Sequence, residues 1–402
     1  MPYNNNRRPG GRNTNKYRSY GGGGASRNRS RKRFGTTIDP ARFVKAAKPV
    51  ESTDYQPKNA FMDFKVSELL KNNMVHKNFS SPTQVQDKAI PLALQGGDVV
   101  GIANTGTGKT IAFLLPLLHK LIENRGEKVI IMAPTRELAL QIEQECKWLA
   151  KGSNLLGVLL IGGVPIGPQL RTLNQNPEII IGTPGRIKDH IERGSLGLSD
   201  VHSVVLDEVD RMLDMGFIDD IRTILSELSD DRQSLFFSAT MNRTIQDLIA
   251  QFSRGAQTVM ARTAETSDNV DQSVRHFQRR EEKIELLHSV LTEVSVEKTL
   301  VFCETKRMVE KLSNELRDRG FKSDAMHGDK SQGARQRALR KFREDHIDIL
   351  VATDVAARGI DVDGITHVIN FDTPQTFDDY THRIGRAGRG GETGYAVTLV
   401  QG

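Results

Sequence analysis

The chain has 402 residues, of which 37% are hydrophobic and 26% are charged. This composition is typical of a soluble globular protein and excludes a chain that is fibrous or disordered throughout. The two cysteines, Cys146 and Cys303, lie too far apart for a disulfide framework or a zinc ribbon, so we expect a reducing compartment, the cytoplasm. No apolar run approaches the roughly 20 residues that a membrane helix needs, and we expect no membrane association.

The N-terminal segment is strongly basic, because residues 1–35 contain ten Lys and Arg residues and no Asp or Glu. The whole chain has a net charge of +6, so subtracting these ten leaves −4 for the remainder. The segment consists largely of Asn, Gly, Ser and Arg and has little to bury, so we predict a disordered basic tail over residues 1–58. We expect it to bind a polyanion such as nucleic acid, with Tyr17 and Tyr20 able to stack on bases. A solvated extension that aids solubility and a transit peptide are the alternatives.

From about residue 60, short apolar runs alternate with segments of helical periodicity, such as 136–150 and 216–228. This alternation is typical of parallel sheets covered by helices, so we predict the α/β class with two tandem domains, 59–262 and 263–402. A polar stretch near 262–270 is the predicted linker. The expected strands, in chain order, are 98–103, 128–133, 158–162, 178–182, 203–206, 234–237, 299–303, 322–326, 347–352, 367–371 and 395–400.

Polar motifs directly follow five of the expected strands in the first domain. They read NTGTGKT, PTREL, TPGR, DEVD and SAT. Because the carboxyl ends of parallel strands share one edge of a sheet, these motifs are expected to gather there and to bind a ligand.

The segment "ANTGTGKT" at 103–110 fits a phosphate-binding loop, with Ala103 in the first glycine position. In such a loop, backbone N–H groups surround phosphate oxygens, Lys109 reaches the outer phosphates and Thr110 binds Mg²⁺. Gly106 and Gly108 let the backbone approach the phosphates closely. The alternative is a plain helix cap.

The segment "SVVLDEVD" at 203–210 places carboxylates at the end of an expected buried strand. A nucleotide site needs a metal carboxylate and a group that polarises water, and we assign these roles to Asp207 and Glu208. Asp210 is expected to pair with a polar group in the SAT or HRIGRAGR segment and so to couple nucleotide state to domain closure. Acidic residues that cap a helix or remain solvated are the alternative for the pair.

From about residue 60 to its end, the chain resembles the DEAD-box RNA helicases of helicase superfamily 2, with DEVD in place of DEAD. The resemblance implies two RecA-like domains that bind ATP and Mg²⁺. It also implies that Phe61 stacks on adenine, Gln86 reads its edge and Asp361 contacts the ribose. By the same resemblance the nucleotide loop comprises Thr105, Gly106, Thr107, Gly108, Lys109 and Thr110. The HRIGRAGR segment is implied to supply the catalytic residues His382, Arg386 and Arg389. Ser238 and Thr240 are implied to act with Asp210 in coupling ATP hydrolysis to domain movement.

The resemblance implies RNA contacts that carry little sequence information, because they go to phosphate and ribose. The implied residues are Pro134, Thr135, Arg136, Gly162, Gly163, Thr183, Gly185, Arg186, Gln332, Arg335, Thr353, Arg358 and Gly359. For any single glycine among them, a turn or a helix cap is the alternative.

The function that follows from this resemblance is an ATP-dependent RNA helicase that is largely independent of RNA sequence. We expect RNA to stimulate its ATP hydrolysis, and hydrolysis to be coupled to closure of two domains on RNA and to local unwinding of short duplexes. We expect a monomer that acts on single-stranded RNA, short duplexes or a ribonucleoprotein. An ATP-gated RNA clamp with little unwinding and a translocating DNA helicase are the alternatives. Three positions depart from the family pattern, namely Asn78, Asn104 and Val209, and Val209 is expected to face packing and to leave hydrolysis intact.

Overall fold

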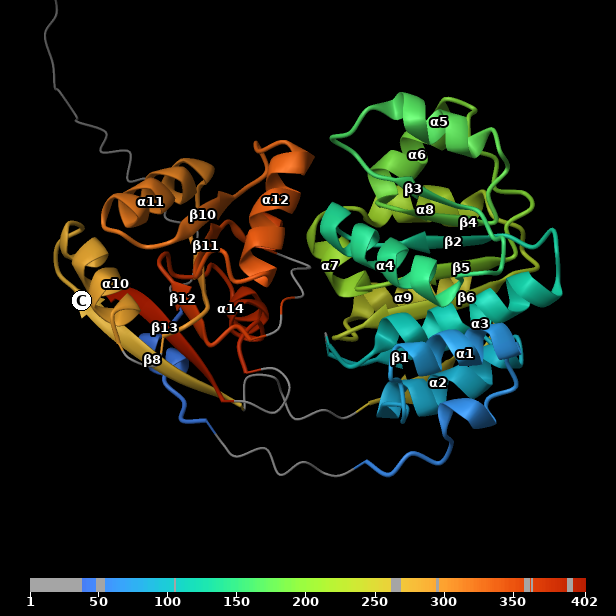
Figure 1. Ribbon diagram of the computed structural model, residues 1–402, viewed down its shortest axis with the longest axis horizontal. Coiled ribbons are helices and arrows are strands. Elements are labelled where there is room, and N and C mark those ends of the chain that lie inside the picture. The colour runs from blue at the N-terminus through green and yellow to red at the C-terminus, as the bar shows by residue number, and fades with distance from the viewer. Residues whose placement is uncertain are drawn as a thin grey trace, which may run out of the picture. The chain divides into compact units, whose positions relative to one another are not determined.

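The computed structural model describes residues 38–47, 55–104, 106–261, 269–293, 296–357, 362, 364–388 and 393–402 (Figure 1). The basic segment 1–35 and most of the predicted linker therefore lie outside the described residues. We call residues 55–261 the first lobe and residues 269–402 the second lobe. No helix in the described ranges is both long enough and apolar enough to cross a membrane.

A parallel sheet of seven strands, in the order β3-β4-β2-β5-β6-β1-β7, forms the centre of the first lobe. Every residue of β2, β4, β5 and β6 is buried, which explains the apolar runs in these strands, although β5 and β6 also bury a few polar residues. The strands are β1 Val99–Ile102, β2 Val129–Met132, β3 Gly157–Leu160, β4 Ile179–Gly182, β5 Ser203–Leu206, β6 Gln233–Ser238 and β7 Gln257–Met260.

Helices cover both faces of this sheet, and each face has its own hydrophobic cluster. Side chains of α1 to α4 belong to one cluster, and side chains of α6 to α9 belong to the other. The helices are η2 Phe61–Asp63, α1 Glu68–His76, α2 Gln84–Leu94, α3 Lys109–Glu123, α4 Arg136–Leu149, α5 Ile166–Leu173, α6 Pro184–Glu192, α7 Val209–Asp214, α8 Ile218–Ser226 and α9 Arg243–Phe252.

The second lobe contains a parallel sheet of six strands in the order β10-β11-β9-β12-β13-β8, again with a hydrophobic cluster on each face. Its strands are β8 Val270–Phe277, β9 Thr299–Phe302, β10 Ser323–Met326, β11 Ile349–Ala352, β12 His367–Asn370 and β13 Gly394–Gln401. Its helices are α10 Glu282–Leu291, α11 Lys306–Asp318, α12 Gln332–Arg343, α13 Asp354–Ala357 and α14 Phe377–Ile384.

These two sheets confirm the predicted fold class, and each predicted strand corresponds to an observed strand within a few residues. Two strands were not predicted, β7 and β8, and both lie at a sheet edge. Only one of the four residues of β7 is buried, so its sequence lacks the apolar run that marks a central strand.

Residues 38–47 also differ from the sequence prediction, which placed them in the basic tail. They include a short 3-10 helix, η1 Pro40–Phe43, that contacts β8 of the second lobe (Figure 1). Phe43 is part of the hydrophobic cluster of that lobe. The tail prediction failed here because the anchoring residues are few and their partners lie more than 200 residues away in the sequence.

Candidate functional site

The phosphate loop joins β1 to α3 and contains two glycines with left-handed backbone angles, Gly106 (φ 80°) and Gly108 (φ 89°). A Cβ atom on Gly108 would collide with the Gln86 side chain, so only glycine fits there. Lys109 begins α3, and its Nζ donates to the Ala103 carbonyl at 2.9 Å. The lysine thus folds back on its own loop, at a helix N-terminus where N–H groups favour an anion. Thr105 lies outside the described residues.

The start of α2 is tied to the same loop. Thr83 Oγ1 donates to the Thr107 carbonyl at 2.7 Å, and Gln86 Nε2 donates to the Gly108 carbonyl at 3.0 Å. Gln86 Oε1 accepts from the Thr83 N–H at 2.8 Å. Gln86 is therefore hydrogen-bonded to the phosphate loop, and its role in reading adenine stays a prediction.

The aromatic ring that was expected to stack on adenine, Phe61, lies in the core of the first lobe. It makes edge contacts with Phe64 at 6.0 Å and Phe79 at 5.9 Å between ring centres. Phe79 lines the cavity beside the phosphate loop and stacks on Trp148, with ring centres 5.5 Å apart. Lys77 lines the same cavity, with Nζ 5.9 Å from the Trp148 ring.

Sequence reasoning missed Trp148, although it is the only tryptophan of the chain. Its position on α4 gave no sign that it would meet the loop before α2, because the two segments are about 70 residues apart. Phe79 was recognised within its motif but was not assigned to the site.

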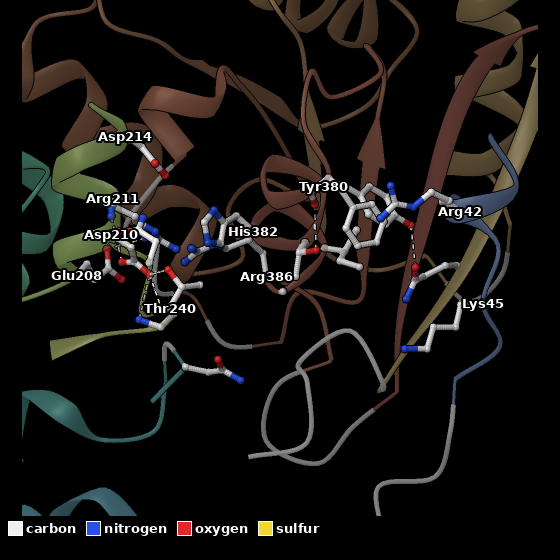
Figure 2. Close-up of a pocket in the computed structure, with 18 of the residues that line it drawn as sticks. Arg42, Lys45, Glu208, Asp210, Arg211, Asp214, Thr240, Tyr380, His382 and Arg386 are labelled. Carbon is white, nitrogen blue, oxygen red and sulfur yellow. Dashed lines mark hydrogen bonds and ion pairs between the residues drawn. The ribbon is translucent and has the colours of Figure 1, made fainter. Parts of the chain in front are cut away.

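The predicted metal and base residues follow β5 directly. Glu208 has left-handed angles (φ 53°, ψ 55°), which are rare outside glycine and cluster at functional sites. Its backbone N–H donates to Asp207 Oδ1 at 3.0 Å. Its Oε2 accepts from Arg211 Nη1 at 2.6 Å (Figure 2). Local hydrogen bonds therefore fix both carboxylates, and Arg211 is a site residue that the sequence analysis did not identify.

Asp207 is 2% exposed, and burial raises its pKa to about 6. Lys109 acts against this rise and Glu208 adds to it. A buried carboxylate of this kind favours a nearby cation, and Thr110 supplies a hydroxyl oxygen to the same cavity. The described residues contain no group of three or more His, Cys, Asp or Glu that could hold a metal. Mg²⁺ needs only one or two ligands from a protein, because it keeps several waters and binds phosphate oxygens of the substrate. Asp207 and Thr110 therefore fit that ion.

Asp210 connects α7 to the end of β6. Its Oδ2 accepts from the N–H groups of Ala239 and Thr240, both at 3.0 Å, and from Thr240 Oγ1 at 3.3 Å (Figure 2). The Asp210 N–H donates to Ser238 Oγ at 3.3 Å. Val209, next to it, is fully buried in the core of the lobe, where the sequence analysis expected packing. The carboxylate segment and the SAT segment therefore form one hydrogen-bonded unit.

The residues of the first lobe that were expected to contact RNA lie at the carboxyl ends of β2, β3 and β4. Six of them share a cavity wall with Arg136, whose guanidinium lies against the Gly162–Gly163 backbone. Gly163 has a φ of 76°, and a Cβ atom there would collide with this guanidinium. These six residues are Pro134, Thr135, Gly162, Thr183, Gly185 and Arg186.

The second lobe places the remaining expected residues on three elements. Gln332 and Arg335 lie in the first turns of α12, Thr353 follows β11, and His382 lies on α14, just before Arg386. Four expected residues of this lobe lie outside the described ranges: Arg358, Gly359, Asp361 and Arg389.

Arg383 lies between the two expected catalytic positions of this segment and has a structural environment of its own. Its Nε and Nη2 donate to the two carboxylate oxygens of Asp354 at 2.6 and 2.7 Å. Its Nη1 donates to Asn370 Oδ1 at 3.1 Å and to the Asp372 carbonyl at 2.7 Å. Arg383 thus ties α14 to α13 and to the end of β12.

Comparisons with known proteins match most of the described chain. Residues 83–248 match the DEAD/DEAH box helicase family model, and residues 282–391 match the helicase conserved C-terminal domain. The chain is 44% identical over 342 residues to the ATP-dependent RNA helicase CshA of Listeria monocytogenes, an alignment that covers 85% of this chain and 66% of CshA. The chain thus spans slightly less than two thirds of that relative.

Two solved structures are also similar. A DEAD box protein from Methanococcus jannaschii is 42% identical with a TM-score of 0.50, over 85% of this chain and 93% of that one. Mss116p bound to ssRNA and AMP-PNP is 31% identical with a TM-score of 0.76, over 84% of this chain and 73% of that one.

Proposed function

Because the chain belongs to the DEAD/DEAH-box helicase family, we propose that it is an ATP-dependent RNA helicase with a DEVD variant of the DEAD motif. RNA stimulates its ATP hydrolysis, which is coupled to closure of two domains on RNA and to local unwinding of short duplexes or remodelling of a ribonucleoprotein. The domains are residues 59–262 and 263–402, and the chain acts as a cytoplasmic monomer.

One observation carries this proposal: the carboxylates after β5 and the phosphate loop after β1 line the same cavity. Lys109 and Thr110 hold the nucleotide phosphates, and Asp207 with Thr110 holds Mg²⁺, which supplies positive charge against the developing negative charge. Glu208 orients the attacking water and takes its proton. Arg386 and Arg389 stabilise the charge that develops on the transferred phosphoryl group.

Arg211 has a place in this scheme because it holds the Glu208 carboxylate by a 2.6 Å ion pair. This ion pair, between two buried side chains, holds the carboxylate in one orientation. We infer that Arg211 positions Glu208 in the nucleotide-free state and shares it with the attacking water when ATP is bound.

RNA is the proposed partner because small residues, hydroxyls and arginines surround Arg136 at the strand ends. Such groups suit phosphate and ribose rather than base edges, so recognition is largely independent of sequence. CshA is named an RNA helicase, and Mss116p is described with ssRNA bound. An ATP-gated RNA clamp remains the second candidate, because it would need the same residues for closure and little turnover.

Phosphate release under multiple turnover tests the proposal, with RNA, with DNA of the same sequence, and without nucleic acid. We expect stimulation by RNA alone, and no turnover in Glu208→Gln, which should still bind ATP and RNA. Glu227→Gln, an exposed carboxyl on the same lobe, is the matched control and should behave as the wild type. Negligible turnover of the wild type with tight ATP-dependent RNA binding would favour the clamp, and equal stimulation by DNA would contradict an RNA-specific helicase.

A further inference from the structure

Residues 38–45, which precede the first lobe in the sequence, contact the helix of the second lobe that leads to Arg386. Phe43 is 0% exposed, and its ring centre lies 4.6 Å from that of Tyr380 on α14. The Arg42 guanidinium lies 4.1 Å above the ring of Phe377, the first residue of α14. Two consecutive side chains thus hold two positions on one face of this helix, since Phe377 and Tyr380 are three residues apart.

The backbone of the same segment pairs with the edge strand β8. The Lys45 N–H donates to the Gln272 carbonyl at 3.1 Å, and the Gln272 N–H donates to the Lys45 carbonyl at 2.8 Å. The Gln272 side chain in turn accepts from the Tyr380 hydroxyl at 3.0 Å (Figure 2). Val44, between the anchors, is 60% exposed. The segment therefore binds α14 directly through its side chains and indirectly through β8.

The position of α14 matters because it sets the position of Arg386. The helix ends at Ile384, and Arg386 follows after a single residue. Catalysis by a charged group depends steeply on its placement, and a shift of about 1 Å can cost on the order of 100-fold in rate. A contact that fixes α14 can therefore act on catalysis without touching the nucleotide.

We propose that residues 38–45 are an intramolecular strap that positions α14, and through it Arg386, for ATP hydrolysis. This inference rests on the proposed catalytic role of Arg386. The strap residues are positioning residues, not catalytic ones. The strap contains three charged residues. Asp39 accepts the Ala41 N–H at the start of η1, Arg42 contacts the Phe377 ring, and Lys45 takes part through its backbone pairing with Gln272.

Full-length variants test the strap, with Phe43→Ala as the main change, Phe43→Leu as the conservative one and Val44→Ala as the control from the same segment. Hydrogen exchange of α14 amides should rise by about 100-fold in Phe43→Ala, because an aromatic ring is lost from the packing. The exchange should rise less in Phe43→Leu and stay unchanged in Val44→Ala. Unchanged α14 exchange in Phe43→Ala would overturn the strap whatever the catalytic role of Arg386.

The catalytic consequence is measured as RNA-stimulated kcat and KM for ATP. We expect kcat to fall about 10-fold in Phe43→Ala, with KM within about two-fold of the wild type because the first lobe holds the ATP. If Phe43→Ala proves too unstable to assay, Arg42→Gln takes its place. This change at an exposed residue removes only the contact with the Phe377 ring and should also lower kcat.

A double-mutant cycle identifies the route of the effect. If the strap acts through Arg386, Phe43→Ala should reduce kcat by less than about two-fold in the Arg386→Ala background. Multiplication of the two single effects would overturn the proposal. A wild-type rate in Arg386→Ala alone would instead refute the role of that arginine, while the exchange measurement would still report on the strap.

Discussion

Replacing Asp207 by asparagine should stabilise the nucleotide-free first lobe at neutral pH while removing its ATPase activity. Burial of this carboxyl raises its pKa from 3.8 to about 6, and Glu208 beside it adds to the rise. The folded chain therefore holds the Asp207 proton more tightly than the unfolded chain does. Folding at neutral pH must bury a charge that Lys109 only partly compensates.

The pKa shift of Asp207 gives the size and sign of its contribution to the free energy of unfolding. Well below pH 3.8 the carboxyl is protonated in both the folded and the unfolded state and costs nothing. The cost grows as the pH rises through 3.8 and is complete well above pH 6. A shift from 3.8 to about 6 corresponds to a destabilisation of ~3 kcal/mol at pH 7.5. Roughly half of this remains at pH 5. Asparagine keeps an oxygen to accept the Glu208 N–H and avoids the charge.

Urea unfolding followed by Trp148 fluorescence measures this effect in the first lobe, because Trp148 is the only tryptophan of the chain. The free energy of unfolding of Asp207→Asn should exceed that of the wild type at pH 7.5, by a margin that shrinks at pH 5. Asp219→Asn, an exposed carboxyl on α8, is the control and should show no such difference. Added ATP and Mg²⁺ should stabilise the wild type more than the variant. Equal or lower stability of Asp207→Asn at pH 7.5 would refute the reasoning.

Three further predictions concern the RNA face, the second lobe and the tail. Gly163→Ala should displace the Arg136 guanidinium and weaken RNA binding about 10-fold in fluorescence anisotropy, whereas Gly167→Ala should not, and equal affinities would contradict that placement. Arg383→Ala should lower the free energy of unfolding of the second lobe by ~3 kcal/mol in thermal denaturation, since it leaves the carboxylate on α13 without its bidentate partner. Deletion of residues 1–35 should weaken RNA binding and flatten its dependence on salt, and an unchanged slope would reduce the tail to a solubility extension.

The central strands of both sheets could be predicted because burial on two faces requires continuous apolar runs. The edge strands could not, since β7 and β8 have one side turned to solvent and mix polar with apolar residues. The order of the strands in each sheet also depends on crossovers that local patterns do not specify.

Motifs of the candidate site were predictable where neighbouring residues act together, as in the phosphate loop and Asp207–Glu208. The stacking of Phe79 on Trp148 was not, because it joins segments about 70 residues apart. The ion pair of Arg211 with Glu208 spans only three residues. It could not be predicted, because it depends on the left-handed backbone angles of Glu208, which no sequence pattern indicates.

The strap has a consequence for the synthesis of the chain. Phe43 leaves the ribosome 337 residues before Tyr380, the ring on which it packs. At about 5–20 residues per second, this aromatic side chain waits roughly 17–70 s for its partner. The first lobe has its own core and can fold in that interval. The second lobe completes its core only when it binds residues 38–45, which are synthesised long before it. During that interval, a helper protein that binds exposed aromatic residues would find Phe43 without the ring on which it packs.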